Sequence, residues 1–514
     1  MKKKLIIIYI CLFGIVFACN DDILEKTNPN GVTVEGYYKN GAELTSAVTS
    51  VYSMLKSNNL VAREWFFLHD LRSDDVAAGG GQLETPRNQL LLGTHDTGNS
   101  VLGTVWLAFY RMIHRANAVI DNSGKVTDLA DADKNRLLGE ARFLRAYAYY
   151  ELVSMWGNVP LYKNYVMTVD GSLPRSPAEE VYAFITAELQ AIQADLPATY
   201  DAANQGRASK GAAQMLLARV YMQLGDYANA KTELLKVYNS GVYSLVDNYN
   251  DNFLEETEFN KESIFEVNFF PSGGVYNWDG DGNGATAGTE TVRTQEYSAI
   301  GWRNVIPSNS LLSEFEKTTK GDAKTDPRYE DSFYFTGEKY NNGANTLTDG
   351  QQNGNSSVVD GVTMKVSWQK YSLMYKMNES FLTGGINQRI MRFAETILSL
   401  AEVENEAGNI SAAVNYLNMI RARKSVSMPA YPTARFPVST KDQVFDAIVH
   451  ERRVEQSGEQ IRNRDILRWR KLSKLKAEPL TYFQANKIEL LPIPQQEVDN
   501  NARIEPADQN PGYN

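Results

Sequence analysis

Cysteine and histidine are scarce in this chain, and their scarcity excludes several kinds of chemistry. The 514 residues include 2 cysteines, Cys11 and Cys19. Cys11 lies in an apolar N-terminal leader, so a chain cleaved before Cys19 keeps one cysteine and forms no internal disulfide. The 4 histidines are His69, His95, His114 and His450. Their spacings include no H-x-x-x-H or H-x-H pair, so neither a zinc centre nor a catalytic thiol is indicated.

Several enzyme motifs and a basic charge balance are also missing. The sequence contains no G-x-S-x-G elbow, no Walker loop and no dinucleotide-binding fingerprint. A glycosidase needs only two carboxylates, and 62 acidic residues leave that class open. The formal net charge is −10, and it becomes −13 once the three lysines of the leader are removed. This argues against nucleic acid as a partner, because phosphate binding requires a basic face.

Residues 1–18 have the pattern of a signal peptide. Lys2–Lys4 precede the apolar run Leu5–Ala18, which is too short to cross a bilayer as a helix. The small residue Ala18 stands directly before Cys19, as in the lipobox of bacterial lipoproteins. We therefore expect residues 1–18 to be removed and Cys19 to carry a lipid anchor. A plain secretory signal with an incidental cysteine is the alternative.

One stretch, residues 139–161, has the strongest helical pattern. Its apolar residues recur every three or four positions, and a second, aromatic row lies beside them. The apolar row is Leu137, Ala141, Leu144, Ala148, Leu152 and Met155, and the aromatic row is Phe143, Tyr147 and Tyr150. The wide apolar arc predicts a central helix that is covered on more than one side and ends at Gly157.

Two further stretches have the spacing of tetratricopeptide repeats. The first places Leu217, Ala218, Tyr221, Gly225, Tyr227, Ala230 and Leu234 at repeat positions. The second places Leu400, Ala401, Gly408, Ala413 and Leu417 at the same offsets. The turn glycines are 183 residues apart, so the helix pairs must pack around a large interruption. Two unrelated helical hairpins are the alternative.

The predicted fold is mostly α: a tetratricopeptide-like helical scaffold with a large loop-rich insertion that contains short strands. We expect residues 19–34 to form a tether and 35–514 a single domain. Its scaffold spans about 35–245 and 386–514, and its insertion spans about 246–385, where Gly, Asn, Asp, Ser and Thr increase. Two runs of the insertion, 263–270 and 362–375, are predicted to be strands.

Loop aromatics are the candidate ligand-binding residues, because a flat ring covers the apolar face of a sugar. Trp278 beside Tyr276 is the best candidate for an exposed platform, and the other tryptophans in or next to loops are Trp302, Trp368 and Trp65. Half-buried packing is the alternative for each of them. The loop at 72–100 supplies candidate partners for hydroxyl groups. These are Asp75, Gln82, Arg87, Asn88 and Asp96.

A calcium-loop pattern overlaps the predicted platform. Asp279, Asp281, Asn283 and Glu290 have the D-x-D-x-N-G-x5-E spacing, whose oxygen ligands suit Ca²⁺. The flanks do not predict two helices, and Asp, Gly and Asn are also ordinary turn residues. The sequence therefore leaves two readings, no cofactor or bound Ca²⁺.

The run ARFLRAYAYYELVSMWGNVPL (141–161) resembles the signature helix of the SusD/RagB family, surface lipoproteins of nutrient uptake in Bacteroidetes-type bacteria. Further resemblance lies in C-terminal elements: His450–Arg453, Arg462, Asp465, Arg468, Trp469, Leu490–Pro494 and Gln509–Tyr513. The Glu/Arg cluster among them is expected to form ion pairs that clamp helices, because nothing nucleophilic accompanies it.

The resemblance implies a lipid-anchored protein on the surface of the outer membrane, with no catalysis. It would capture an oligosaccharide or polysaccharide and hand it to a SusC-like TonB-dependent transporter, with its ligand site where the loop at 72–100 meets the insertion. Three alternatives stay open. They are a binder of peptides or another nutrient in the same kind of complex, a surface glycoside hydrolase, and a helical scaffold that binds only proteins.

Overall fold

The computed structural model describes residues 36–271, 276, 278, 280, 289–378, 383–485 and 489–513. The predicted leader, Cys19 and the tether lie outside these residues. Within the described part of the chain, none of the helices combines the length and the apolar composition needed to cross a bilayer.

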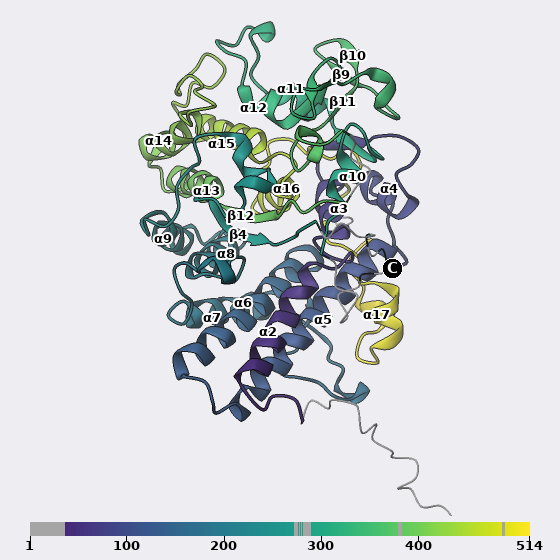
Figure 1. The fold of residues 1–514 in the computed structure, drawn as a ribbon, viewed down its shortest axis with the longest axis vertical. Helices are drawn as coiled ribbons and strands as arrows, with labels where there is room; N and C mark the ends of the chain where they lie inside the picture. Colours follow the sequence, from purple (N-terminus) through teal and green to yellow (C-terminus); the bar gives the residue numbers. More distant parts are fainter. Residues whose placement is uncertain are drawn as a thin grey trace, which may run out of the picture.

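Long helices form the N-terminal part of the scaffold. They are α2 (Gly41–Leu55), α5 (Ser100–Asn122), α6 (Asp131–Trp156) and α7 (Ala178–Ile192). These helices fill the lower half of Figure 1, where α6 contacts α2, α5 and α7. Leu144, Tyr147 and Leu152 of α6 are completely buried, as the wide apolar arc predicts. The helix ends at Gly157, whose φ of 73° lies in the region that favours glycine.

The two predicted hairpins pack against each other. They are α8 (Lys210–Leu224) with α9 (Tyr227–Tyr238), and α13 (Phe393–Glu406) with α14 (Ile410–Arg421). Gly225 and Gly408 end the first helix of each pair with φ values of 75° and 80°. Because α13 contacts both α9 and α14, the second hairpin continues the array of the first across the intervening insertion. The predicted tetratricopeptide-like scaffold is therefore confirmed. It continues into α15 (Lys441–Gln456) and α16 (Arg462–Lys471).

Short antiparallel strand pairs are scattered through the described residues. They are β1 (Val76–Ala78) with β5 (Val305–Pro307), β2 (Val159–Pro160) with β3 (Arg175–Ser176), β4 (Ser263–Val267) with β12 (Gln388–Arg392), β6 (Phe333–Phe335) with β11 (Val366–Trp368), β7 (Lys339–Tyr340) with β8 (Asn345–Thr346), and β9 (Ser357–Val359) with β10 (Val362–Met364). The strand predicted over 362–375 is wrong in its length. Around Lys365 the chain changes partner from β9 to β6, and beyond Trp368 it turns into a 3-10 helix at Leu373–Tyr375.

Short helices complete the described chain. They are α3 (Glu64–Asp70), α4 (Thr85–Leu92), α10 (Arg293–Tyr297), α11 (Asn309–Glu314), α12 (Pro327–Ser332) and α17 (Gln495–Asn500). The segment 72–100, predicted as a loop, contains β1 and α4. The helix starts with Pro86 in its first turn and stops at Gly93, whose φ is 66°. In the upper half of Figure 1, α4 is drawn next to α10, a helix of the insertion.

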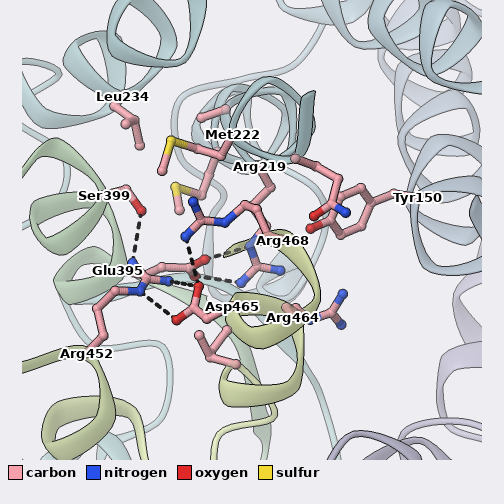
Figure 2. Close-up of a pocket in the computed structure, with 14 residues that line it drawn as sticks. Tyr150, Arg219, Met222, Leu234, Glu395, Ser399, Arg452, Arg464, Asp465 and Arg468 are labelled. Carbon is pink, nitrogen blue, oxygen red and sulfur yellow. Dashed lines mark hydrogen bonds and ion pairs between the residues drawn. The ribbon is translucent and has the colours of Figure 1, made fainter. Parts of the chain in front are cut away.

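Charged side chains clamp the helices of the array. Arg219 of α8 donates from Nε to Oε1 of Glu395 on α13 over 2.8 Å. Arg452 of α15 donates to Asp465 of α16 over 2.7 Å, and Asp465 also accepts from Arg468 over 3.0 Å. Figure 2 shows these side chains converging from different helices. The space left between them is about 30 Å³, which is too small for a ligand. The predicted clamping ion pairs are confirmed.

Candidate ligand-binding site

The segment 72–100 and the insertion meet through backbone pairing. Strand β1 lies antiparallel to β5, with Ala77 opposite Ile306. Just beyond this pair, Gly79 donates to the carbonyl of Asn304 over 2.8 Å. A Cβ atom at Gly79 would clash with the carbonyl oxygen of Arg303, so only glycine allows this close approach. The two zones expected to supply a ligand site are thus physically joined.

Two stacked tryptophans lie at this junction, and we call them the tryptophan pair. The indoles of Trp278 and Trp302 have centroids 5.5 Å apart and planes at 25°. Trp278 keeps 43% of its surface exposed, whereas Trp302 is partly buried. Tyr276 meets Trp278 edge-on at 4.8 Å and is itself buried. Trp302 and Tyr276 therefore support an aromatic ring that faces solvent.

Asn58, in the connection between α2 and α3, holds the Trp278 segment against the scaffold. Its backbone N–H donates to the carbonyl of Gly280 over 2.7 Å, and its side-chain amide donates to the carbonyl of Trp278 over 2.6 Å. The hydroxyl of Tyr276 donates to the side-chain oxygen of Asn58. The position of the exposed indole is therefore set by a buried residue more than 200 positions earlier in the chain.

An arginine lies over the exposed indole and is itself neutralised. The guanidinium of Arg63 is 5.1 Å from the ring centroid of Trp278. Arg63 donates to Glu296 over 2.7 Å and to Glu84 over 3.4 Å. Burial raises the pKa of Glu296 above its ordinary value, against the opposing effect of Arg63. Asn304 donates to the second oxygen of Glu296 over 2.5 Å, so both oxygens of this carboxyl group accept hydrogen bonds.

A second arginine next to the platform is also paired. Arg87 of α4 donates to Glu64 and forms an ion pair with Glu84, and its guanidinium lies 4.8 Å from the ring centroid of Phe67. Arg63 and Arg87 together face three carboxylates, those of Glu64, Glu84 and Glu296. Both arginines are therefore paired with carboxyl groups.

Trp65 and Trp368 are buried, so the prediction that they belong to an exposed platform is wrong. Trp65 is 2% exposed because α3 turns it into the core, where its indole N–H donates to Glu151 over 3.3 Å. Trp368 of β11 is 1% exposed and packs on Phe333 of the paired strand at 5.2 Å. Both tryptophans therefore serve as packing residues, which was the alternative to a role in ligand binding. Tyr276 is also buried, so it supports the platform without forming its outer face.

Two of the predicted polar contacts are buried as well. Asp75 accepts from Arg453 over 2.7 Å and is 2% exposed, and Arg87 is 5% exposed and paired as described. Neither presents a free polar group to a hydroxyl. Gln82 and Asp96 are exposed and Asn88 is partly exposed, so these three stay predictions as ligand contacts.

Sequence reasoning missed the residues that organise the tryptophan pair. Asn58, Arg63, Glu84 and Glu296 belong to no motif, and their role depends on contacts between distant segments. The polar pair Asn58–Asn59 between two helical patterns marks a turn, which is the one local signal the sequence offers here.

The predicted calcium loop falls largely outside the described residues, since these exclude Asp279, Asp281 and Asn283. Glu290 is described. It is buried, and its carboxylate accepts a hydrogen bond from the hydroxyl of Thr383. Calcium binding stays a prediction.

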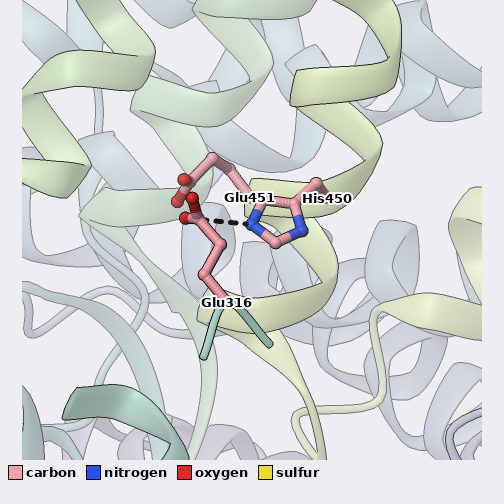
Figure 3. Close-up of side chains that lie close together, drawn as sticks. All are labelled: Glu316, His450 and Glu451. Atoms are coloured by element: carbon pink, nitrogen blue, oxygen red, sulfur yellow. Dashed lines mark ion pairs between the residues drawn. The ribbon is translucent and has the colours of Figure 1, made fainter. Parts of the chain in front are cut away.

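A different cluster, Glu316, His450 and Glu451, has ligand atoms close enough to surround a metal ion (Figure 3). Arg421 already bridges its two carboxylates, donating to Glu316 over 2.7 Å and to Glu451 over 2.6 Å. Burial alone would lower the pKa of His450, but hydrogen bonds to Glu314 and Glu316 raise this pKa to about 9. A protonated imidazole has no lone pair for a metal, so we interpret the cluster as an ion-pair network.

The fold and the surface site define a class: a tetratricopeptide-like helical protein whose loop-rich insertion carries exposed aromatic residues. A family model described as the SusD family matches residues 261–513. A second, described as "Starch-binding associating with outer membrane", matches residues 37–222. A SusD-like relative also aligns along the whole length of the chain. The chain therefore belongs to the SusD/RagB family, as the signature helix indicates.

Relatives and solved structures agree with this assignment. The chain is 28% identical to SusD-like protein P2 of Formosa agariphila, an alignment that covers 99% of this chain and 100% of that protein. The structure of a laminarin-binding SusD-like protein is 25% identical, with a TM-score of 0.74 and coverage of 93% and 100%. That of surface glycan-binding protein A from Bacteroides fluxus is 26% identical, with a TM-score of 0.72 and coverage of 92% and 99%.

Proposed function

We propose that this protein is a cell-surface glycan-binding lipoprotein that captures oligosaccharides and delivers them to a SusC-like TonB-dependent transporter, without catalysis. The exposed indole of Trp278, supported by Trp302, is the observation that carries the proposal. The part of this ring that Trp302 and Arg63 leave exposed can contact the apolar face of a sugar while its neighbours bind the hydroxyl groups. Two structural relatives are named for laminarin or glycan binding, which supports the same ligand class.

The charges around the platform favour a neutral glycan. Arg63 and Arg87 are committed to glutamates, so neither offers an uncompensated cation to a sulfated or uronic sugar. A shallow stacking surface with a few hydrogen bonds gives modest affinity and fast release, which suits transfer to a transporter.

A binding role also fits the carboxylates next to the platform. Glu296 is completely buried and cannot reach a bound sugar, and Glu84 pairs with two arginines. A glycosidase requires a protonated acid and a second carboxylate that both face the scissile bond. Glu84 and Glu296, among the described residues, do not have that arrangement, which supports capture as the proposed role.

Calorimetric titration tests the proposal directly. A soluble form that begins after Cys19 is titrated with starch, fructan, xylan, mannan, laminarin and pectic oligosaccharides, and with a peptide mixture. The ligand is recovered and analysed by chromatography after several hours. Binding of one glycan class without cleavage supports the proposal. Heat from peptides alone would move the protein to peptide uptake, and released product would make it a hydrolase.

The anchor and the transporter are tested in cells. Cys19→Ser removes the residue that we expect to be lipidated, so the variant should leave the outer-membrane fraction while it still binds the glycan. Crosslinking on intact cells should capture the wild type with a TonB-dependent transporter. An anchored Cys19→Ser protein would contradict the lipoprotein assignment.

Calcium is tested on metal-stripped protein. If Asp279, Asp281, Asn283 and Glu290 bind Ca²⁺, titration of the ion releases heat and raises the melting temperature. Absence of both effects would refute the calcium site.

A further inference from the structure

A cavity of about 200 Å³ lies between the segment 198–209, which connects α7 to α8, and residues 242–266, where the scaffold passes into the insertion. Its described lining includes neither tryptophan of the tryptophan pair, nor Asn58 or Arg63. Sites that enclose a drug-sized ligand usually measure about 300–1,000 Å³, so this smaller space suits one unit of a larger molecule. The cavity is therefore a second concave surface, built from other residues than the proposed platform.

Phe259 lines this cavity with a strained backbone. Its φ of 52° lies in the left-handed region, which a bulky side chain rarely adopts. The turn around it is fixed by Asn260, whose side chain donates to the carbonyls of Asp251 and Thr257 over 2.9 and 3.0 Å. The same side chain accepts from the backbone N–H of Glu262 over 2.9 Å. Strain of this kind persists where the surrounding structure enforces it, and it is concentrated at ligand-binding and active sites.

The strained turn brings the ring of Phe259 against Gly206 on the opposite side of the cavity. The Cε1 and Cζ atoms of the ring lie 3.5 and 3.6 Å from the position that a Cβ atom would take at Gly206. Gly206 has a φ of 86°, so a larger residue there would be strained. Tyr200 and Tyr243 line the same cavity, and all three rings are partly exposed. They give the cavity an aromatic wall.

Uncharged polar side chains complete the lining. Thr199 and Gln205 are exposed and Ser263 is partly exposed. Within the part of the chain that the structure describes, these three side chains have no hydrogen-bond partner. A hydroxyl or amide group both donates and accepts, and so do the hydroxyl groups of a sugar. The cavity therefore combines rings with the polar groups that a sugar unit requires.

The charged groups of the lining do not define a charge-selective site. Arg207 donates to Glu140 over 2.8 Å. Glu266 is buried and accepts from the backbone N–H of Phe259 over 3.1 Å. Lys261 is exposed, so solvent screens its charge. Recognition at this cavity therefore depends on its rings and its uncharged polar groups.

We propose that this cavity is a second glycan-binding site, which holds one sugar unit. Phe259 packs against the apolar face of the sugar, and Thr199, Gln205 and Ser263 exchange hydrogen bonds with its hydroxyl groups. The inference rests on the proposed glycan-binding function, but not on Trp278 as the platform. A long glycan that reaches both sites is held at two points, so it binds more tightly than a short one.

The test uses detergent-solubilised full-length protein and short probes: maltotriose, laminaritriose, xylotriose and mannotriose, with triglycine as the peptide probe. Calorimetry should show two molecules of one trisaccharide bound per chain, and Trp278→Ala should weaken one of them and leave the other. Loss of both in Trp278→Ala, or a single bound molecule in the wild type that Trp278→Ala weakens, would overturn this inference and leave the proposed function standing. Binding of no trisaccharide, or of triglycine alone, would overturn both.

Variants locate the second site. Phe259→Gly removes the ring, and glycine adopts a φ of 52° without strain, so the variant should fold while it binds the sugar at this site about tenfold more weakly. Thr199→Trp, at an exposed position of the lining, should block the same site. Thr232→Trp, at an exposed position of α9, is the matched control and should leave both sites unchanged. Unchanged two-site binding in both Phe259→Gly and Thr199→Trp would place the second molecule elsewhere and refute the proposal.

Discussion

The indole of Trp278 lies against the indole of Trp302, with centroids 5.5 Å apart and planes inclined by 25°. Trp302 lies in the loop just before β5, and the carbonyl of Trp278 accepts a hydrogen bond from the side chain of Asn58. The pair therefore joins the insertion to the first helices of the scaffold. If the proposed glycan binds at Trp278, we expect both parts of the chain to support it.

The first prediction concerns the exposed ring itself. Trp278→Ala removes the stacking surface, so the dissociation constant for the glycan should rise roughly tenfold or more. Stability should change by less than about 1 kcal/mol, because a ring that is 43% exposed contributes little to the core. Calorimetry and urea unfolding measure the two effects. Val362→Ala, which alters an exposed apolar residue of β10, is the control, and an unchanged dissociation constant for Trp278→Ala would refute the assignment.

The second prediction concerns Asn58, which acts on the platform through the backbone. Asn58→Ala leaves the carbonyl of Trp278 and the hydroxyl of Tyr276 without their partner. We expect a loss of about 1–3 kcal/mol in the free energy of unfolding, since buried polar groups lose hydrogen bonds. Glycan affinity should fall as well, because the indole is no longer fixed. Tryptophan fluorescence should shift in the same variant, and a stable variant with full affinity would contradict this role.

The helical scaffold could be predicted because its signals are local. Ala218, Gly225 and Ala230 stand at fixed offsets within one hairpin, and the small side chains that the helices need for close packing are visible in the sequence. Both alanines are completely buried, and Gly225 has the positive φ that the turn requires. The packing of this hairpin beside the second one followed from the same pattern.

The site was only partly predictable, because exposure depends on distant contacts. Trp65 and Trp278 both occur next to predicted loops, yet one donates to buried Glu151 and the other faces solvent. Asp75 lies in a polar segment that was predicted to bind hydroxyl groups. Its carboxylate instead accepts a hydrogen bond from Arg453, 378 positions later. No local pattern in the sequence predicts these contacts between distant residues.

The third prediction tests the ion pairs between α13 and α16. Arg468 donates to both oxygens of Glu402 and to Asp465, and all three side chains are buried. Arg468→Ala leaves two buried carboxylates without this partner, and should cost about 3–5 kcal/mol of unfolding free energy. The matched control is Lys163→Ala, which removes a pair whose side chains are both about half exposed and should cost less than about 1 kcal/mol. Equal effects in the two variants would show that burial of the pair is not decisive.

The fourth prediction concerns pH. Glutamates around His450 raise its pKa from 6.5 to about 9 in the folded protein. Because the folded pKa is the higher one, the stabilisation is complete below about pH 6.5 and is lost as the pH rises through 9. A shift of this size corresponds to roughly 3 kcal/mol. Burial lowers the pKa of Lys370 from 10.5 to about 8, so its contribution makes stability rise between about pH 8 and 10.5, which opposes the loss from His450 where the two ranges overlap.

Comparison of His450→Gln with the wild type separates these two contributions, since Lys370 is present in both. The difference in unfolding free energy should be largest near pH 6 and should shrink steadily as the pH approaches 9.5, where the wild-type imidazole has lost its proton. Urea unfolding at half-unit steps of pH measures this difference. His114→Gln should show no such trend between pH 7 and 9.5, because burial lowers the pKa of His114 and its imidazole is uncharged throughout that range. A difference that stays constant with pH would mean that His450 stabilises the fold by packing against Phe436, 4.5 Å away, and not by its charge.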